Sequence, residues 1–199
     1  MKKLVFATNN QHKVDEIRYL LGSVCDICSL ADLDFTGDIP ENQTALEGNA
    51  LEKARFVYKK FGLPCFADDT GLEIDALGGE PGVFSARYAG EEKNSLSNIE
   101  KVLTKMHDID NRRARFRCVI ALIIDCNEHI FEGAISGEIL RLPVGDFGFG
   151  YDSVFKADGY DVSFAQMTLA EKSKISHRGK ALEKLMDFLK KSFPLQKKQ

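Results

Sequence analysis

A membrane-spanning helix needs about 20 consecutive apolar residues, and the sequence contains no run close to that length. It also lacks a signal peptide, because the apolar stretch that follows Lys2 and Lys3 is too short for one. Internal repeats, low-complexity tracts and a linker are missing too. These absences predict a cytoplasmic protein without a membrane partner, and a single domain over residues 1–199.

Excess charge of either sign is also missing. The formal net charge is −3 over 199 residues, which argues against binding to a nucleic acid polymer. The only basic tail, Lys197-Lys198, is too short to change this and is typical of a frayed terminus. Because 44% of the residues are hydrophobic and 29% are charged, we expect an ordinary folded protein in which local basic clusters can still hold a small polyanion.

The cysteines and glycines exclude several common sites. Cys25 and Cys28 have C-x-x-C spacing, but no second pair follows at zinc spacing. Cys65 and Cys118 stand in apolar runs, which favours small core residues in a reducing compartment. Neither the P-loop pattern nor the dinucleotide-binding glycine pattern occurs.

The stretch from Cys65 to Gly82 carries the most concentrated chemistry. We expect a strand that ends at an acidic turn, Asp68-Asp69, followed by a second short strand and a loop. Adjacent acids at a strand end suit the binding of a hard cation. A solvated turn without function is the alternative.

The N-terminus predicts strand, turn and helix. Residues 3–7 form a short apolar strand, and Asn9-Asn10 can make the tight left-handed turn that glycine often makes. The following helix begins near Lys13 and would present backbone N–H groups to an anion. Lys13 as an ordinary solvated helix residue remains an equal alternative.

The other elements follow from apolar periodicity. They are a strand at 24–29, helices at 45–61 and 92–106, a strand at 113–125 with a hairpin partner at 129–137, and a last helix ending near 193. We place Leu96 on the inward side of its helix and the hairpin turn near residues 126–128. His129, beside that turn, is expected to be solvated or capping and not a ligand. The apolar second half of strand 113–125 indicates burial on both faces.

Residues 145–152, GDFGFGYD, combine three glycines with three aromatic residues. Glycine permits the backbone to approach a ligand closely, and an aromatic ring can stack on a flat base. A glycine-rich loop around a core phenylalanine is the alternative.

The C-terminal part contains two helix starts. Thr168 and Glu171 form a capping-box pattern, and Ser176 is a good N-cap that puts His177 and Arg178 in a first helical turn. Cations there oppose the helix dipole at a cost of a few tenths to about 1 kcal/mol each. A local cost without a structural gain hints at function.

Charged side chains at element ends thus form a possible constellation. The basic members are Lys13, Lys53, Lys172, His177 and Arg178, and the acidic members are Glu41, Asp68 and Asp69. Acids for Mg²⁺, cations for phosphate oxygens and an aromatic ring for a base would together make a nucleoside triphosphate site. Glu41 alone is weak evidence, because an acid before a helix usually serves the helix dipole.

Five ordered motifs over essentially the whole length resemble the inosine/xanthosine triphosphate pyrophosphatase family, which removes non-canonical purine nucleotides. The motifs are Thr8-Asn9-Asn10-x-x-Lys13, Glu41 to Arg55, Ala67 to Leu72 with Pro81 to Tyr88, Phe149-Gly150-Tyr151-Asp152, and Glu171-Lys172-x-x-x-Ser176-His177-Arg178-Gly179. The resemblance implies an α/β fold with an elongated mixed β-sheet flanked by helices, two lobes with an active-site cleft between them, and a homodimer.

The resemblance also implies an activity and residue roles. The activity is Mg²⁺-dependent hydrolysis of ITP, dITP and XTP to the monophosphate and pyrophosphate. Glu41 and Asp69 would hold Mg²⁺, and Asp69 would accept the proton of the attacking water, although Asp68 remains a candidate for that role. The substrate-binding residues would be Thr8, Asn9, Asn10, Gln11, His12, Lys13, Lys53, Thr70, Phe149, Gly150, Tyr151, Asp152, Lys172, His177 and Arg178.

The chain departs from the family pattern at four positions, Leu46, Gly48, Asp146 and Ser153. Gly48 stands where an acid is common, which leaves Glu41 and Asp69 as the metal ligands implied. Two other functions remain open at this point: a pyrophosphatase for modified pyrimidine nucleotides, and a nucleotide-binding module without turnover.

Overall fold

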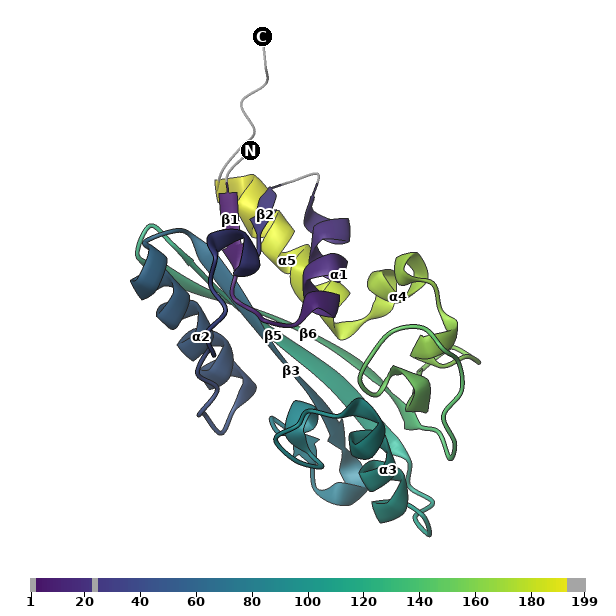
Figure 1. Ribbon diagram of the computed structural model, residues 1–199. Helices are drawn as coiled ribbons and strands as arrows, with labels where there is room; N and C mark the ends of the chain where they lie inside the picture. Colours follow the sequence, from purple (N-terminus) through teal and green to yellow (C-terminus); the bar gives the residue numbers. More distant parts are fainter. Residues whose placement is uncertain (1–2, 23–24, 193–199) are drawn as a thin grey trace. The chain divides into compact units, whose positions relative to one another are not determined.

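The computed structural model describes residues 3–22 and 25–192, and the chain divides into two compact units (Figure 1). The first unit takes its residues from 1–68, 119–132 and 180–199, and the second consists of 69–118 and 133–179. Val24, Phe193 and the Lys197-Lys198 tail, which the sequence predictions include, lie outside the described residues.

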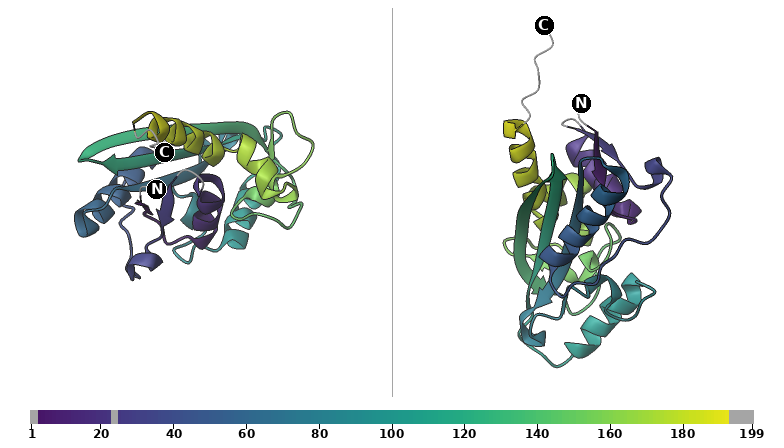
Figure 2. Two further views of the ribbon diagram at one scale, coloured as in Figure 1. Left: turned by 90° about the horizontal axis from the view of Figure 1, so that it is seen from above. Right: turned by 90° about the vertical axis from the view of Figure 1, so that its left-hand side faces the viewer.

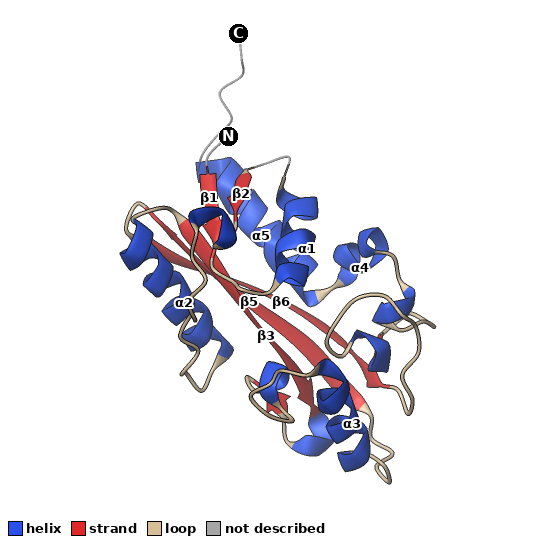
Figure 3. Cartoon of the chain, in the orientation of Figure 1, coloured by secondary structure: helices blue, strands red, loops and turns tan. Residues whose placement is uncertain are grey.

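The strands form a mixed sheet (Figure 3). Among the described residues the strands are β1 (Lys3–Phe6), β2 (Asp26–Cys28), β3 (Cys65–Ile74), β4 (Pro81–Gly82), β5 (Arg113–Ile124), β6 (Asn127–Ile139) and β7 (Phe155–Ala157). Their hydrogen-bonded order is β2-β1-β3-β5-β6-β7, with β4 paired to β3. Strand β1 is parallel to β2 and β3, whereas β4 and β7 run antiparallel to β3 and β6. The prediction of a mixed α/β fold is confirmed.

Helices supply the rest of the regular structure. They are α1 (Gln11–Leu21), α2 (Leu46–Phe61), α3 (Ser95–Lys105), α4 (Leu169–Ile175) and α5 (His177–Ser192). Short 3-10 turns lie at Ala31–Leu33, Asp75–Leu77, Ser85–Arg87, Asp152–Val154 and Phe164–Gln166. None of these helices is both long and apolar enough to cross a lipid bilayer.

In the first unit, α2 packs on β3 and α5 packs on β6. Phe6 of β1 and Phe66 of β3 stack with ring centroids 4.5 Å apart, and the Cys65 thiol lies against the Ala54 carbonyl of α2 at 3.2 Å. Helix α5 lies along β6 (Figure 2). The Phe188 ring of α5 contacts the His129 ring of β6 at a centroid distance of 4.3 Å. His129, which was predicted to be solvated or capping, is half-buried, and the Phe188 ring covers part of it.

The second unit has its own apolar core. Its buried members include Leu72, Ile74, Ile99, Val102, Met106, Phe116, Ile139, Val154, Phe155 and Phe164. Leu96 is 78% exposed, so its predicted inward position is wrong. Helix α3 begins only at Ser95, which leaves Leu96 in the first turn, beyond the buried residues Ile99 and Val102.

Strand β3 differs most from the sequence prediction. It continues from Cys65 through Asp68 and Asp69 to Ile74 without a turn. A turn at the acids would break β3 between Cys65 and Phe66, which pair with β1, and Leu72 and Glu73, which pair with β4. Asp68 and Asp69 are accordingly buried, with relative exposures of 1% and 8%, and are not a solvated turn.

The hairpin between β5 and β6 is confirmed, but its turn is shorter and earlier than predicted. The strands are joined by Asp125 and Cys126, whose φ angles are 50° and 62°. Two consecutive residues in the left-handed region define a type I′ turn, whose twist matches that of the flanking strands.

Candidate active site

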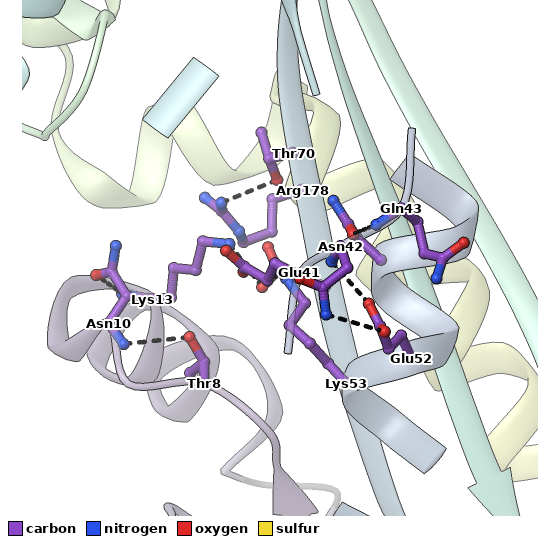
Figure 4. A network of polar contacts seen from close by, with 12 residues as sticks. Thr8, Asn10, Lys13, Glu41, Asn42, Gln43, Glu52, Lys53, Thr70 and Arg178 are labelled. Atoms are coloured by element: carbon purple, nitrogen blue, oxygen red, sulfur yellow. Dashed lines mark hydrogen bonds and ion pairs between the residues drawn. The ribbon is translucent and has the colours of Figure 1, made fainter. Parts of the chain in front are cut away.

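The loop between β1 and α1 is fixed by the side chains of Thr8 and Asn10 (Figure 4). The side-chain oxygen Oδ1 of Asn10 accepts from the Lys13 backbone amide at 3.2 Å, and the Asn10 backbone amide donates to the Thr8 hydroxyl at 3.2 Å. Asn10 has φ −87° and is an N-cap, so the predicted left-handed turn is wrong. Asparagine serves here through its side-chain oxygen, not through its tolerance of positive φ. Asn9 instead donates to the Gly37 carbonyl at 3.1 Å.

Lys13 projects from the first turn of α1 and donates to Asp68 at 2.9 Å. The Asp68 side chain is fully buried, whereas that of Lys13 keeps 15% exposure. Gln11 and His12, which precede Lys13, are both exposed. The ion pair neutralises one of the two adjacent acids inside the first unit.

Glu41 and Lys53 form a second ion pair in the first unit (Figure 4). The Lys53 ammonium donates to the Glu41 carboxylate at 2.8 Å, and the Lys53 side chain is only 4% exposed, against 27% for Glu41. A buried ammonium needs such a partner, because desolvation disfavours its charged form. Glu41 therefore does more than serve the dipole of α2.

In the second unit, Asp152 organises the glycine-rich loop. Its carboxylate accepts the Phe149 amide at 2.8 Å and the Lys172 ammonium at 2.6 Å. The same ammonium lies 5.1 Å from the centroid of the Phe149 ring, and the Arg178 guanidinium lies 5.5 Å from it. Two cations thus lie within cation–π range of the ring that we predicted to stack on a base.

Tyr151 joins this loop to the segment that follows β4. Its hydroxyl donates to the Ser85 carbonyl at 2.9 Å, and its ring is 5% exposed. Burial raises the pKa of Tyr151 above its ordinary value. The predicted site residue Tyr151 is therefore placed inside the second unit, while its neighbour Gly150 is half-buried in the loop.

The start of α5 holds His177 and Arg178 in buried positions. The Ser176 hydroxyl accepts the Gly179 amide at 3.1 Å, which confirms Ser176 as the N-cap. The His177 ring stacks on Phe116 at a centroid distance of 4.6 Å, and Arg178, 1% exposed, donates to the Thr70 hydroxyl at 3.3 Å. Both side chains thus contact other residues of the second unit.

The capping box at the start of α4 is confirmed. Thr168 and Glu171 exchange the two expected hydrogen bonds. A Cβ on Gly179 would lie 1.8 Å from the Ser173 carbonyl oxygen, so glycine is needed where α5 begins close to α4. The close approach at Gly179 therefore fixes how α4, which carries Lys172, lies against the start of α5, which carries Arg178.

The predicted metal ligands suit Mg²⁺ better than a metal that needs a complete protein cage. Within residues 3–22 and 25–192 there is no group of three or more His, Cys, Asp or Glu side chains that could surround an ion. Mg²⁺ keeps several waters and binds through one or two carboxylates plus substrate phosphates. Glu41, whose carboxylate is partly exposed, has the oxygen chemistry for that role, as has Asp69.

Sequence patterns did not reveal the hydrogen bonds that join α2 to the segment after Glu41. The Glu52 carboxylate accepts from the Asn42 amide at 2.8 Å, and Asn49 accepts from the Gln43 amide at 2.9 Å. The hydrogen bond from the Asn42 backbone amide lowers the pKa of Glu52. The available signal was the i, i+3, i+4 spacing of Asn49, Glu52 and Lys53, which puts three polar side chains on one side of a helix.

The fold and these residues define a class of mixed α/β protein in which the first unit carries acid–lysine pairs and the second carries a glycine-rich aromatic loop. The Ham1 family model matches residues 4–188, and the chain belongs to the Ham1 family.

Curated relatives confirm the resemblance found in the sequence. A protein of Porphyromonas gingivalis named "dITP/XTP pyrophosphatase" is 52% identical over 190 residues, which cover 95% of this chain and 98% of that protein. A protein of Flavobacterium psychrophilum with the same name is 50% identical over 188 residues, 94% of this chain and 99% of the relative.

Solved structures agree in fold. The Ham1 protein of Staphylococcus aureus superposes with a TM-score of 0.86 at 38% identity, covering 96% of this chain and 100% of that one. A HAM1 protein from Coxiella burnetii gives a TM-score of 0.87 at 39% identity with the same coverage.

Proposed function

We propose that this protein hydrolyses the non-canonical purine nucleoside triphosphates ITP, dITP and XTP to the monophosphate and pyrophosphate. The observation that carries the proposal is identity of 50% or more, over nearly complete chains, to proteins named dITP/XTP pyrophosphatases. Such an enzyme keeps deaminated purines out of DNA and RNA.

The triphosphate would be bound by the loop from Thr8 to Lys13, by Lys53 and by Thr70. Supporting this, the Asn10 cap orders the first turn of α1, and Lys13 and Lys53 are held in ion pairs with acids. Phosphate oxygens can compete for those ammonium groups because they are strong anionic acceptors. Positioning and charge neutralisation carry most of the catalysis of phosphoryl chemistry.

The base would be recognised by residues 149–152, Lys172, His177 and Arg178. A purine stacked on Phe149 would extend the cation–π arrangement that this ring has with Lys172 and Arg178. A donor aimed at the 6-oxo group would face another donor if the base were adenine. Sites built on such hydrogen bonds can discriminate by about 10⁴–10⁵.

Glu41 and Asp69 would hold Mg²⁺, which supplies charge neutralisation for the phosphates when bound. We assign the general base to Asp69: its carboxylate takes a proton from the water whose oxygen attacks phosphorus, and pyrophosphate leaves. This assignment follows the family resemblance, and the adjacent Asp68, which is paired with Lys13 at 2.9 Å, is the alternative base. A well-placed base contributes roughly 10²–10⁴ in rate.

A nucleotide panel with pyrophosphate detection, run with and without Mg²⁺, tests the proposal. ITP, dITP and XTP should release pyrophosphate only with Mg²⁺, and ATP should be much poorer. Release of orthophosphate, or equal turnover of ATP, would contradict it. Preference for modified UTP or CTP would indicate a pyrimidine enzyme, and tight ITP binding without hydrolysis would indicate a binding module.

We also propose that the protein is a cytoplasmic homodimer that binds neither membranes nor nucleic acid polymers. All five cysteines are free, and Cys25, Cys28, Cys65 and Cys118 are buried, as expected in a reducing compartment. Light scattering after size exclusion should give twice the chain mass of 22.2 kDa. A monomeric mass at micromolar concentration would reject the dimer.

A further inference from the structure

The segment that follows Glu41 is fastened to helix α2 by both oxygens of one carboxylate. Glu52 accepts the Asn42 backbone amide at 2.8 Å through Oε2, and the Asn42 side-chain amide at 3.3 Å through Oε1 (Figure 4). Asn42 itself is exposed, so water could have satisfied both of its donors. The bidentate contact is therefore not required to satisfy the hydrogen-bond donors of Asn42, and its main effect is to fix the orientation of this residue.

Neighbouring side chains of α2 extend the contact in both directions. Asn49, which is 1% exposed, accepts the Gln43 backbone amide at 2.9 Å. Lys53 donates to Glu41 at 2.8 Å. Three consecutive residues, 41, 42 and 43, are thus each held by a different side chain of α2. Residue 53 holds 41, residue 52 holds 42, and residue 49 holds 43.

Gly48 allows this close approach. A Cβ at position 48 would lie 2.7 Å from the Cβ of Gln43. A larger residue there would push the segment away from α2 and separate Asn49 from the Gln43 amide. The glycine and the three polar side chains therefore serve the same arrangement.

We propose that Glu52 and Asn49 are positioning residues for Glu41, and that through it they set the affinity of the protein for a divalent cation. They act on the backbone of residues 42 and 43 and so restrict where the Glu41 carboxylate can lie. This inference rests on the proposed function, in which Glu41 is a metal ligand. Partners that orient a ligand in this way typically contribute 10–100-fold to metal affinity.

Binding of Mn²⁺ alone, followed by electron paramagnetic resonance without nucleotide, tests the proposal. Glu52→Ala should raise the dissociation constant for Mn²⁺ by about 10-fold, while kcat for ITP at saturating metal stays close to the wild-type value. Hydrogen exchange of the Asn42 amide should speed up in the same variant. Glu52→Gln keeps an acceptor for that amide and should recover part of the affinity.

The matched control is Glu128→Gln. Glu128 accepts two hydrogen bonds from Arg55, both at 2.7 Å, so this variant also weakens a bidentate contact of α2. It leaves residues 41–43 untouched and should leave Mn²⁺ binding unchanged. An equal loss of affinity in Glu128→Gln would reduce the role of Glu52 to general support of the helix and overturn the proposal.

Two further results distinguish failure of this inference from failure of the proposed function. Wild-type Mn²⁺ affinity in Glu52→Ala, combined with faster Asn42 exchange and normal pyrophosphate release, would overturn the positioning role alone. Wild-type Mn²⁺ affinity in Glu41→Gln would remove the metal ligand on which both proposals depend. Loss of Mn²⁺ binding in Glu41→Gln together with weaker binding in Glu52→Ala supports the inference.

Discussion

Lys172 donates to Asp152 at 2.6 Å, and each of the two side chains is only 6% exposed. Removing one charge of a buried pair leaves the other without compensation, which typically costs 3–5 kcal/mol. Lys172→Met, which keeps most of the side-chain length, should therefore lower the free energy of unfolding by about that amount. Urea denaturation measures it.

The double variant Lys172→Met/Asp152→Asn separates the cost of an uncompensated buried charge from the cost of altered side-chain packing. Because it removes both charges, it should be more stable than Lys172→Met alone. If the two variants are equally stable, the Asp152 charge is not the source of the cost. The double variant should also bind ITP poorly, since the Asp152 carboxylate accepts the Phe149 amide at 2.8 Å.

Gly148 and Gly150 offer a matched pair for testing the shape of the same loop. Both have positive φ, 78° and 63°, so alanine at either costs about 1–2 kcal/mol in backbone strain. A Cβ at 148 would also lie 2.1 Å from an Asp152 carboxylate oxygen, whereas a Cβ at 150 would meet nothing within 4 Å. Gly148→Ala should therefore increase the KM for ITP by much more than Gly150→Ala does. Equal KM values would mean that strain alone, not the Asp152 contact, governs the loop.

Local signals made much of this architecture predictable. The capping box at Thr168 and the N-cap at Ser176 depend on residues within three positions of each other, so the sequence contains the whole interaction. The helix boundaries at α2 and α5 and the buried second half of β5 follow from apolar periodicity in the same way. The family motifs indicated which side chains to follow, while their roles remain predictions.

Contacts between distant parts of the chain were not predictable from local patterns. Two consecutive aspartates predict a turn on propensity alone. Burial of Asp68 inside β3 becomes tolerable only because Lys13, 55 residues earlier, supplies the opposite charge. The contacts of Asn42 with Glu52 were missed for a related reason, since an exposed asparagine in a loop carries no signal of its partner.

Cys126 should be the single thiol that reacts in the native protein. It is exposed, whereas the other four cysteines are buried. Burial raises the pKa of Cys25 to about 11 and that of Cys65 to about 12. At pH 8 both thiols are therefore neutral, and their thiolate forms appear only as the pH rises toward those values. We expect one equivalent to react quickly with a disulfide reagent at pH 8, and five in denaturant.

Cys126→Ser provides the control for that measurement. It should abolish the fast equivalent and leave the slow ones in place. Fast reaction of a second thiol in this variant would mean that one of the buried cysteines becomes accessible through local opening. Tyr58, whose hydroxyl lies 3.4 Å from the Cys126 sulfur, can keep a hydrogen bond to the serine hydroxyl, so stability should change little.

Asp68 and Asp69 are consecutive residues of one strand, and their asparagine variants should fail in different ways. Asp69→Asn should keep the fold and lower kcat by roughly 10²–10⁴, the contribution of a positioned general base. Asp68→Asn removes the partner of Lys13 at 2.9 Å, and loss of a charged hydrogen bond costs about 1.5–3 kcal/mol. It should therefore unfold at lower urea concentration while keeping more of its turnover than Asp69→Asn.

Pyrophosphate release from ITP and urea denaturation, measured on both variants, separate the two effects. Near-normal turnover in a folded Asp69→Asn protein, together with a large loss of turnover in Asp68→Asn, would transfer the base role to Asp68. The reason is that asparagine has no carboxylate and cannot accept the proton of the attacking water.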